Sequence, residues 1–261
     1  MASLTDRTAL VTGVSRAVGI GAAIARRLAA DGARLFLTGW APHDAAQPWG
    51  EDRGGGERIR DELRSQGTDV HWVASDLIDP KAPAELFRAA AAAVGPVDIL
   101  VANHARSAEQ SLLELTAEEL DRCFAANARA TLLLIRQFVE QHPGDRDGRI
   151  VTFTSGQYHG AMPAELPYIA SKAVIQQLTA TLAVELAPRR ITINCVNPGP
   201  NDTGYATGEL HRRVAAAMPM GRWGRPEDAA RLVAWLCSDE AGWITGQTIA
   251  SDGGWSARGS S

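Results

Sequence analysis

Cysteine is scarce in this chain, which has Cys123, Cys195 and Cys237 among 261 residues. Because they are scattered and odd in number, they predict neither a disulfide framework nor a metal site. A basic excess is missing too, since 26 Lys and Arg stand against 30 Asp and Glu, for a net charge of −4. This balance gives no electrostatic reason to expect nucleic acid or an anionic membrane as a partner.

The beginning of the chain has no apolar segment after a basic start, because MASLTDRTALVTG passes directly into a strand-like run. We therefore expect no signal peptide, no membrane-spanning segment and a cytoplasmic location. Hydrophobic residues make up 45% and charged residues 21% of the chain, as in ordinary globular proteins. This length can bury a large core, and we expect one domain over residues 1–261.

Short apolar runs alternate with helical patterns such as APAELFRAAAAAVG along the whole chain. This alternation predicts right-handed crossovers and a mostly parallel α/β sheet. Ligands of such sheets bind beyond the carboxyl ends of the strands. The predicted strands are Thr8–Thr12, Arg34–Thr38, Val70–Ala74, Ile99–Ala102, Ile150–Thr154, Ile191–Val196 and Gln247–Ala250.

A glycine-rich turn follows the first predicted strand, in TALVTGVSRAVGIGAAIA. Gly13, Gly19 and Gly21 let the backbone approach a pyrophosphate, and free N–H groups at the start of the next helix favour negative charge. A lone glycine-rich turn is a weak signal. A strand before it and a helix after it supply the context that a dinucleotide site requires.

Tyr168 and Lys172 lie four residues apart in YIASK. On a helix this spacing places both side chains on one face, with Cβ atoms about 5–6 Å apart. An ammonium beside a phenol is expected to lower the tyrosine pKa from about 10, which suits proton transfer near neutrality. Ser155 ends the apolar run RIVTFTS, where its hydroxyl can bond an oxygen whose charge changes. Together they indicate carbonyl–alcohol chemistry, although an isolated Tyr–Lys pair is usually an interfacial tyrosine and a solvated lysine.

With these motifs in this order, almost the whole chain resembles the short-chain dehydrogenase/reductase family. The family's first turn appears as Thr12-Gly13 and Gly19-Ile20-Gly21, with two extra residues between. Its catalytic tetrad is matched by Asn127, Ser155, Tyr168 and Lys172. The resemblance implies a Rossmann-type, doubly wound α/β fold with a mostly parallel seven-stranded sheet and helices on both faces.

The resemblance also implies a nicotinamide cofactor. Asp76, in VASDL, matches the acid that contacts adenine, and Asn103 remains from the family's Asn-Asn-Ala-Gly run. His104 and Ala105 depart from that run, and His104 is either near the nicotinamide or a satisfied turn histidine. The expected cofactor contacts are Gly13, Ser15, Arg16, Gly19, Ile20, Gly21, Asp76, Leu77, Asn103, Tyr168, Lys172, Pro198, Gly199 and Thr203.

Charge near the second strand favours NADPH, with NADH as second choice. NAD-specific relatives carry an acid at the end of that strand. Here the place reads Thr38-Gly39-Trp40, and the nearest acid, Asp44, comes later, so nothing is expected to repel a 2′-phosphate. Arg16 resembles the basic residue that pairs with this phosphate, and a guanidinium fork suits it. A solvent-facing Arg16 is the competing interpretation.

Two segments interrupt the regular order. Gly39–Arg58 is rich in Gly and Pro and predicts a long loop, either a surface insertion or a cover for the adenosine ribose. Residues 202–225 match the family's substrate-covering loop and small helices. Their apolar Met218, Met220 and Trp223 are expected in the core more than on the substrate.

The resemblance implies hydride transfer between a nicotinamide cofactor and a small-molecule ketone or secondary alcohol. Tyr168 is expected to exchange the proton, Lys172 to bind the nicotinamide ribose, and Asn127 to hold a relay water. A homodimer or homotetramer is expected by analogy. One alternative is an enoyl-acyl carrier protein reductase, whose glycine turn is similarly extended, but Glu165 stands where that branch has its tyrosine. The other is a non-catalytic dinucleotide sensor.

Overall fold

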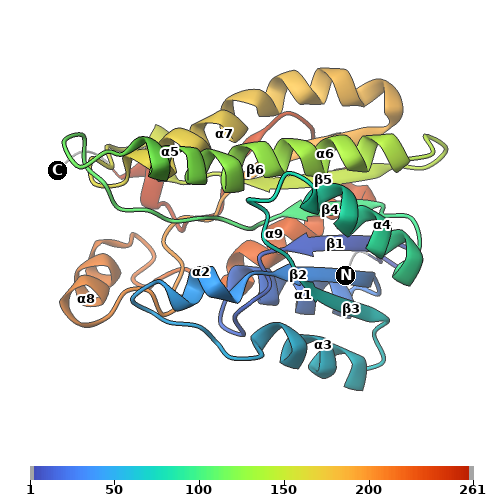
Figure 1. Cartoon of the computed structure of the whole chain (residues 1–261), viewed down its shortest axis with the longest axis horizontal. Coiled ribbons are helices and arrows are strands. Elements are labelled where there is room, and N and C mark those ends of the chain that lie inside the picture. Colours follow the sequence, from blue (N-terminus) through green and yellow to red (C-terminus); the bar gives the residue numbers. More distant parts are fainter. Residues whose placement is uncertain (1–2, 259–261) are drawn as a thin grey trace.

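The computed structural model describes residues 3–258 and contains a seven-stranded sheet in the order β3-β2-β1-β4-β5-β6-β7 (Figure 1). All neighbouring strands are parallel. The seven predicted strands are confirmed, with ends within two residues of those expected. They are β1 Thr8–Thr12, β2 Arg34–Gly39, β3 Val70–Ala74, β4 Ile99–Ala102, β5 Gly148–Phe153, β6 Ile191–Asn197 and β7 Thr248–Ala250.

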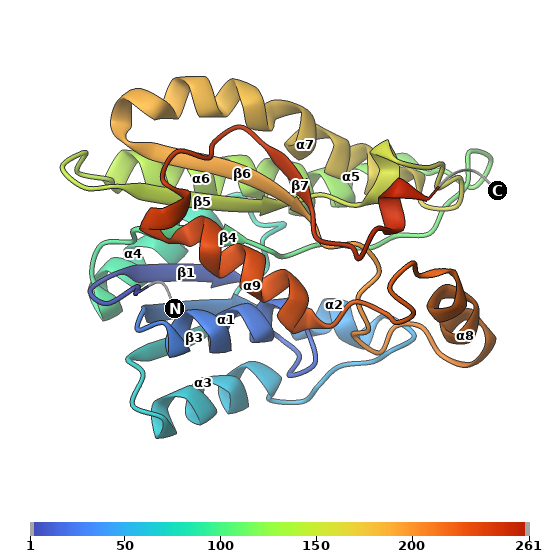
Figure 2. The same cartoon turned by 180° about the vertical axis from the view of Figure 1, so that it is seen from behind.

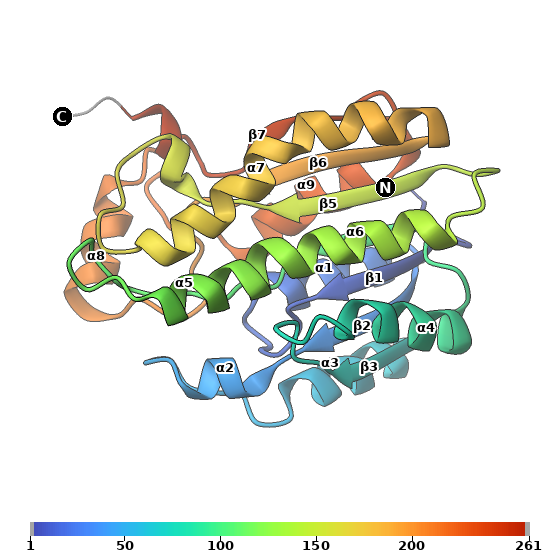
Figure 3. The same ribbon diagram turned by 45° about the horizontal axis from the view of Figure 1, so that its top comes forward.

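Helices cover both faces of the sheet, as predicted. One face carries α1 (Ile20–Ala30), α3 (Gly55–Ser65) and α9 (Pro226–Cys237), which stand in front of the strands in Figure 2. The other face carries α4 (Ala82–Val94), α5 (Ala117–Cys123), α6 (Ala130–Gln141) and α7 (Leu166–Leu186), seen best in Figure 3. Two helices, α2 (Ala41–Ala45) and α8 (Gly208–Ala217), lie beyond the carboxyl ends of the strands.

Two cores result from this arrangement, because successive strand residues point to opposite faces. In β1, Ala9 and Val11 belong to the core under α1 and α9. Leu10 belongs to the core under α4, α6 and α7. A parallel sheet covered on both sides needs apolar residues at every position, which is why the strands read as continuous apolar runs.

The predicted long helix through Asn127 is present but not regular. Between α5 and α6, Phe124–Arg129 forms a π-helical turn. Such turns are rare inside α-helices and occur frequently at functional sites. Residue pattern alone predicted a continuous α-helix here, because the π turn keeps the same residue types and changes only the hydrogen-bond partners.

The prediction of a long loop over Gly39–Arg58 is wrong in part. The helix α2 occupies Ala41–Ala45, and α3 begins at Gly55. Proline near a helix start costs no hydrogen bond, and Pro42 stands there in α2. Most of the stabilisation comes from contacts that the local sequence does not show, described below.

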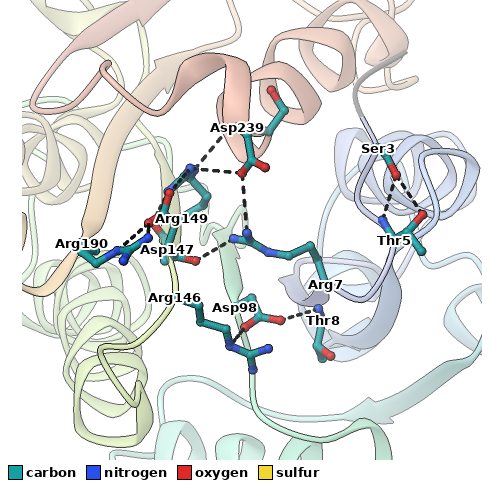
Figure 4. Close-up of polar contacts among 12 residues, drawn as sticks. Ser3, Thr5, Arg7, Thr8, Asp98, Arg146, Asp147, Arg149, Arg190 and Asp239 are labelled. Atoms are coloured by element: carbon teal, nitrogen blue, oxygen red, sulfur yellow. Dashed lines mark hydrogen bonds and ion pairs between the residues drawn. The ribbon is translucent and has the colours of Figure 1, made fainter.

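A cluster of charged side chains covers the amino-terminal ends of the strands (Figure 4). Arg149, only 1% exposed, donates from Nη1 to the Gly148 carbonyl at 3.1 Å and from Nη2 to Asp147 Oδ2 at 3.1 Å. Asp98 Oδ2 accepts the Thr8 N–H at 2.9 Å. The Asp98 side chain thus joins β1 to the start of β4, and the Arg149 N–H donates to the Asp98 carbonyl at 3.0 Å, which adds β5.

Among residues 3–258, no helix is long and apolar enough to cross a membrane. Within the same residues, no three or more His, Cys, Asp or Glu side chains gather as metal ligands would.

Candidate active site

Two adjoining cavities open at the carboxyl edge of the sheet, and Arg16, Ile20 and Thr203 line both. The first, of about 590 Å³, contains ten of the expected cofactor contacts. The second, of about 1130 Å³, contains four more of the expected site residues. The first is lined by Gly13, Ser15, Arg16, Gly19, Ile20, Gly21, Asp76, Leu77, Asn103 and Thr203. The second adds Ser155, Tyr168, Pro198 and Gly199.

Glycine is required at the first turn. Gly13 has φ +75°, and a Cβ there would lie 2.6 Å from Asn103 Nδ2. A Cβ on Gly21 would lie 2.3 Å from the Gly13 carbonyl oxygen. Asn103 Nδ2 donates to the carbonyl oxygens of Thr12 and Gly13, at 3.0 and 3.2 Å. The turn is therefore drawn tightly against the end of β4, and the free N–H groups at the start of α1 remain beside the first cavity.

His104 is a satisfied turn histidine, the second of the two interpretations. Its Nε2–H donates to the Ala126 carbonyl at 2.9 Å, so its Nδ1 accepts the Thr12 hydroxyl at 2.7 Å. Burial lowers the pKa of His104 to about 3, and the nearby Lys172 ammonium contributes. The neutral ring thus connects the ends of β1 and β4 to the π turn.

Ser155 and Tyr168 line the second cavity, and Lys172 lies buried beside Tyr168 without lining either cavity. The Ser155 and Tyr168 hydroxyls are hydrogen-bonded, and Lys172 Nζ lies 5.9 Å from the centroid of the Tyr168 ring. Nζ also donates to the Phe153 carbonyl at 3.2 Å. Tyr168 and Lys172 thus lie near each other at the start of α7, as their four-residue spacing predicted. Ser155 joins them from the end of β5.

The expected effect of Lys172 on Tyr168 is not what the structure shows. Burial raises the pKa of Tyr168 to about 12, and the hydrogen bond from Ser155 only partly opposes this. Burial instead lowers the pKa of Lys172 to about 8. The desolvation of the Tyr168 phenol outweighs its attraction to the Lys172 ammonium, whose Nζ lies 5.9 Å from the ring centroid. Nζ donates its hydrogen bond to the Phe153 carbonyl and not to the phenol. The phenol is therefore a proton donor at neutral pH.

Asn127 lies in the π turn, 1% exposed, behind Lys172 and outside both cavities. Its Oδ1 accepts the Arg106 N–H at 2.7 Å. Its Nδ2 donates to the Arg106 carbonyl and to Ser171 Oγ, both at 2.9 Å. These bonds use both side-chain N–H donors, so the amide fixes the loop after β4 against α7.

Asp44 and Trp49, from the segment expected to be a long loop, are functional candidates that were not among the expected site residues. Ser15 Oγ donates to Asp44 Oδ2 at 2.6 Å, and Trp49 Nε1 donates to Asp44 Oδ1 at 3.2 Å. The Arg16 guanidinium carbon lies 5.8 Å from the Trp49 ring centroid. The sequence led us to expect nothing near the end of the second strand that would repel a 2′-phosphate, whereas the structure places the Asp44 carboxylate of α2 on the glycine-rich turn, in the first cavity.

Residues 202–225 lie over the second cavity, and their apolar side chains are divided between the core and the surface. Met218 and Trp223 are buried, as expected, whereas Met220 is 70% exposed. Tyr205, from the same segment, lines the cavity together with Glu165 at the start of α7. Burial raises the pKa of both side chains, Tyr205 to about 12.

Known proteins share this arrangement. A family model described as enoyl-(acyl carrier protein) reductase matches residues 13–256. The oxidoreductase YjdA of Bacillus subtilis is 39% identical over 256 residues, covering 97% of this chain and 98% of the relative. The chain belongs to the short-chain dehydrogenase/reductase family. It is accordingly an oxidoreductase of a family that binds NAD(P).

Other members of the family extend the comparison. A 3-oxoacyl-[acyl-carrier-protein] reductase, FabG, of Staphylococcus epidermidis is 32% identical over 254 residues, covering 95% of this chain and 98% of the relative. A blue fluorescent protein from a metagenomic library, solved in complex with NADPH, matches with a TM-score of 0.86 and 33% identity. That match covers 97% of this chain and 99% of the other.

Proposed function

We propose that this oxidoreductase interconverts a ketone and a secondary alcohol. The observation that carries the proposal is the closeness of Tyr168 to Ser155 and Lys172, with Tyr168 and Ser155 lining the second cavity. In the direction of reduction, Ser155 donates a hydrogen bond to the carbonyl oxygen and Tyr168 delivers its phenolic proton to the same atom. General acid catalysis of this kind needs a protonated donor within hydrogen-bond reach. A pKa of about 12 keeps the Tyr168 phenol protonated.

The residues of the first cavity fit a dinucleotide. The tightly held glycine turn leaves the start of α1 open to a pyrophosphate, because helix N-termini favour anions. Asp76 and Leu77 would contact the adenine, and Pro198, Gly199 and Thr203 the nicotinamide end. Lys172 would hold the ribose hydroxyls, with Asn127 as the residue that positions the loop behind it. When bound, the nicotinamide supplies or accepts the hydride.

Two observations bear on which nicotinamide cofactor is preferred. Arg16 in the turn, together with the NADPH complex of a structural neighbour, favours NADPH. The carboxylate of Asp44 on Ser15 favours NADH. Both forms would present the same hydride to the Tyr168 side of the cavity, so the proposed reaction does not depend on the choice.

Oxidation of NADH and of NADPH against a panel of small ketones and 3-oxoacyl thioesters tests the proposal. We expect carbonyl-dependent consumption of the cofactor by the wild-type chain, and its loss in Tyr168→Phe with cofactor binding retained. Binding of a reduced cofactor without turnover on any carbonyl would favour the dinucleotide sensor instead. Binding of neither cofactor would refute the proposal.

Enoyl reduction is a second candidate, favoured by the description of the matching family model and by the extended first turn. The side chain that would replace a tyrosine there, Glu165, is a carboxyl whose pKa burial raises. Consumption of cofactor with a 2-enoyl thioester, but not with the matching 3-oxoacyl thioester, would select this candidate.

We also propose that one domain binds both ligands, with residues 202–225 covering the substrate, and that the chain forms a homodimer or homotetramer. Apolar side chains exposed on the helices beside the tetrad support an assembly, Val184 being 78% and Phe124 40% exposed. Exposed apolar groups gathered on one surface commonly mark protein interfaces. Light scattering of the purified chain gives the mass that tests it.

A further inference from the structure

Asp44 is built into the adenosine end of the first cavity. Its side chain is 9% exposed, lines that cavity and comes from α2, directly after β2. Two donors hold its carboxylate, Ser15 Oγ at 2.6 Å and Trp49 Nε1 at 3.2 Å. These two hydrogen bonds hold the carboxylate in one orientation. Each oxygen retains a further lone pair.

The end of β2 leaves no room for an acid. A Cβ on Gly39 would lie 2.7 Å from the Val14 carbonyl oxygen, so no side chain fits where the strand meets the turn. The acid comes instead from Asp44, five positions after Gly39 in the sequence. Its carboxylate accepts a hydrogen bond from Ser15 in the glycine-rich turn.

Arg16 forms no ion pair with this carboxylate among the described residues. Its guanidinium lies over the Trp49 ring at 5.8 Å, and its Nη2 lies 3.6 Å from the position of a Cβ on Gly204. It thus stands at the partition between the two cavities, both of which it lines. On the side of β2 and α2 the cavity is lined by Thr38, Gly39, Trp40, Pro42, His43 and Ala46. Arg106 and Arg122 also line it, and each is paired with a glutamate, Glu119 and Glu118 respectively.

We propose that Asp44, held by Ser15 and Trp49, selects the cofactor: it accepts a hydrogen bond from the adenosine ribose and repels a 2′-phosphate, so that this chain prefers NADH. The inference rests on the proposed dinucleotide site and replaces the expectation drawn from Arg16. An ionised carboxylate and a phosphate in one partly desolvated pocket repel each other, and Ser15 is already engaged as a donor. Trp49 acts as a positioning residue through Asp44.

Binding without turnover tests this inference. The probes are 5′-AMP and 2′,5′-ADP, which differ only by the 2′-phosphate, followed by NADH and NADPH, all titrated calorimetrically into wild type. We expect wild type to bind the member of each pair that lacks the 2′-phosphate at least about tenfold more tightly, or by about 1.4 kcal/mol. Asp44→Asn, which keeps the shape and removes the charge, should reduce that ratio by about tenfold or more.

Asp52→Asn is the matched control. Asp52 Oδ2 accepts the Ala17 N–H of the same turn at 2.9 Å, but Asp52 does not line the first cavity. Asp52→Asn changes the net charge by the same amount as Asp44→Asn. Its ratio of affinities for ligands without and with the 2′-phosphate should therefore equal that of wild type. Tighter wild-type binding of NADPH and 2′,5′-ADP would overturn the inference, whether or not the variants fold. An unchanged ratio in folded Asp44→Asn would overturn it too. Failure of wild type to bind either dinucleotide would instead refute the proposed function on which it rests.

Discussion

The two ends of the parallel sheet use polar residues in opposite ways. At the amino-terminal ends, Arg149 and Asp98 are buried and form ion pairs or bonds to strand backbones (Figure 4). At the carboxyl ends, Lys172 is buried and Tyr168 is half-buried, neither with an ionic partner among the described residues, and their pKa values are shifted to about 8 and about 12. Paired charges fix the first end, whereas desolvated and unpaired groups make the second end reactive.

The chain places its stabilising ion pairs and its proposed reactive groups at opposite ends of the sheet. Ligands of open α/β sheets bind beyond the carboxyl ends of the strands, where loops and helix N-termini meet. The opposite end is free to be closed by salt bridges, as between Arg146 Nε and Asp98 Oδ1 at 2.6 Å. Substitutions at the two ends should therefore produce different defects.

The largest expected effect is at the carboxyl end. Tyr168→Phe removes the proposed proton donor and should lower kcat by about 10²–10⁴-fold, with the free energy of unfolding little changed. Steady-state kinetics on a carbonyl substrate, together with urea unfolding, measure both. Ser155→Ala serves as a companion, since it removes the partner hydroxyl and leaves the phenol. Wild-type turnover in Tyr168→Phe would contradict the assignment.

Arg149→Ala should give the converse defect. Removing the buried Arg149 side chain leaves the Ser238 and Gly148 carbonyls without the guanidinium donor, and a lost buried hydrogen-bond partner typically costs about 1–3 kcal/mol of the free energy of unfolding. The control is Arg190→Ala, because Arg190 pairs with the same Asp147 while its own side chain is 60% exposed. Exposed pairs contribute about 0–1 kcal/mol. Equal unfolding midpoints for the two variants would show that burial of Arg149 carries no special weight.

Activity should depend on pH through Lys172. Its pKa of about 8 means that the ammonium is present below that pH and is lost above it. If the charged form binds the cofactor, kcat/KM for reduction should fall by about tenfold per pH unit above about 8. Lys172→Arg keeps the charge throughout and should lose this limb. A limb that persists in Lys172→Arg would assign it to another group.

The smallest effect concerns acid stability. His104 is neutral in the fold with a pKa of about 3, below its ordinary value of 6.5. The unfolded chain therefore binds the extra proton as the pH falls below 6.5, and stability decreases. At pH 5.5 this one group should cost about 1.4 kcal/mol, or about 2–4 °C in Tm. His104→Asn should show a correspondingly flatter dependence of Tm on pH, and an unchanged slope would remove His104 from this account.

The sequence predicted the sheet more completely than the candidate site. Every strand was predicted, since covering both faces of a parallel sheet leaves a continuous apolar run in the sequence. The short helix α2 was not predicted. Its Asp44 is bonded to Ser15, which lies 29 positions earlier, and a local pattern does not show such a contact. The resemblance to a family brought Ser155, Tyr168 and Lys172 together, and the structure places them so.

Two features of the site had no signal in the sequence. The direction of the Tyr168 pKa depends on how far burial outweighs the lysine, and residue spacing does not measure burial. The π turn at Phe124–Arg129 changes hydrogen-bond partners without changing residue types. His104 was left with two interpretations, and only its bonds to Thr12 and Ala126 decide between them.

The most direct test of the division between the two ends measures carbonyl-dependent cofactor oxidation and urea unfolding on the same preparations of Tyr168→Phe and Arg149→Ala. The account expects Tyr168→Phe to keep its unfolding midpoint and lose turnover, and Arg149→Ala to lose stability while its folded fraction turns over at the wild-type rate. Parallel loss of rate and stability in both variants would contradict it.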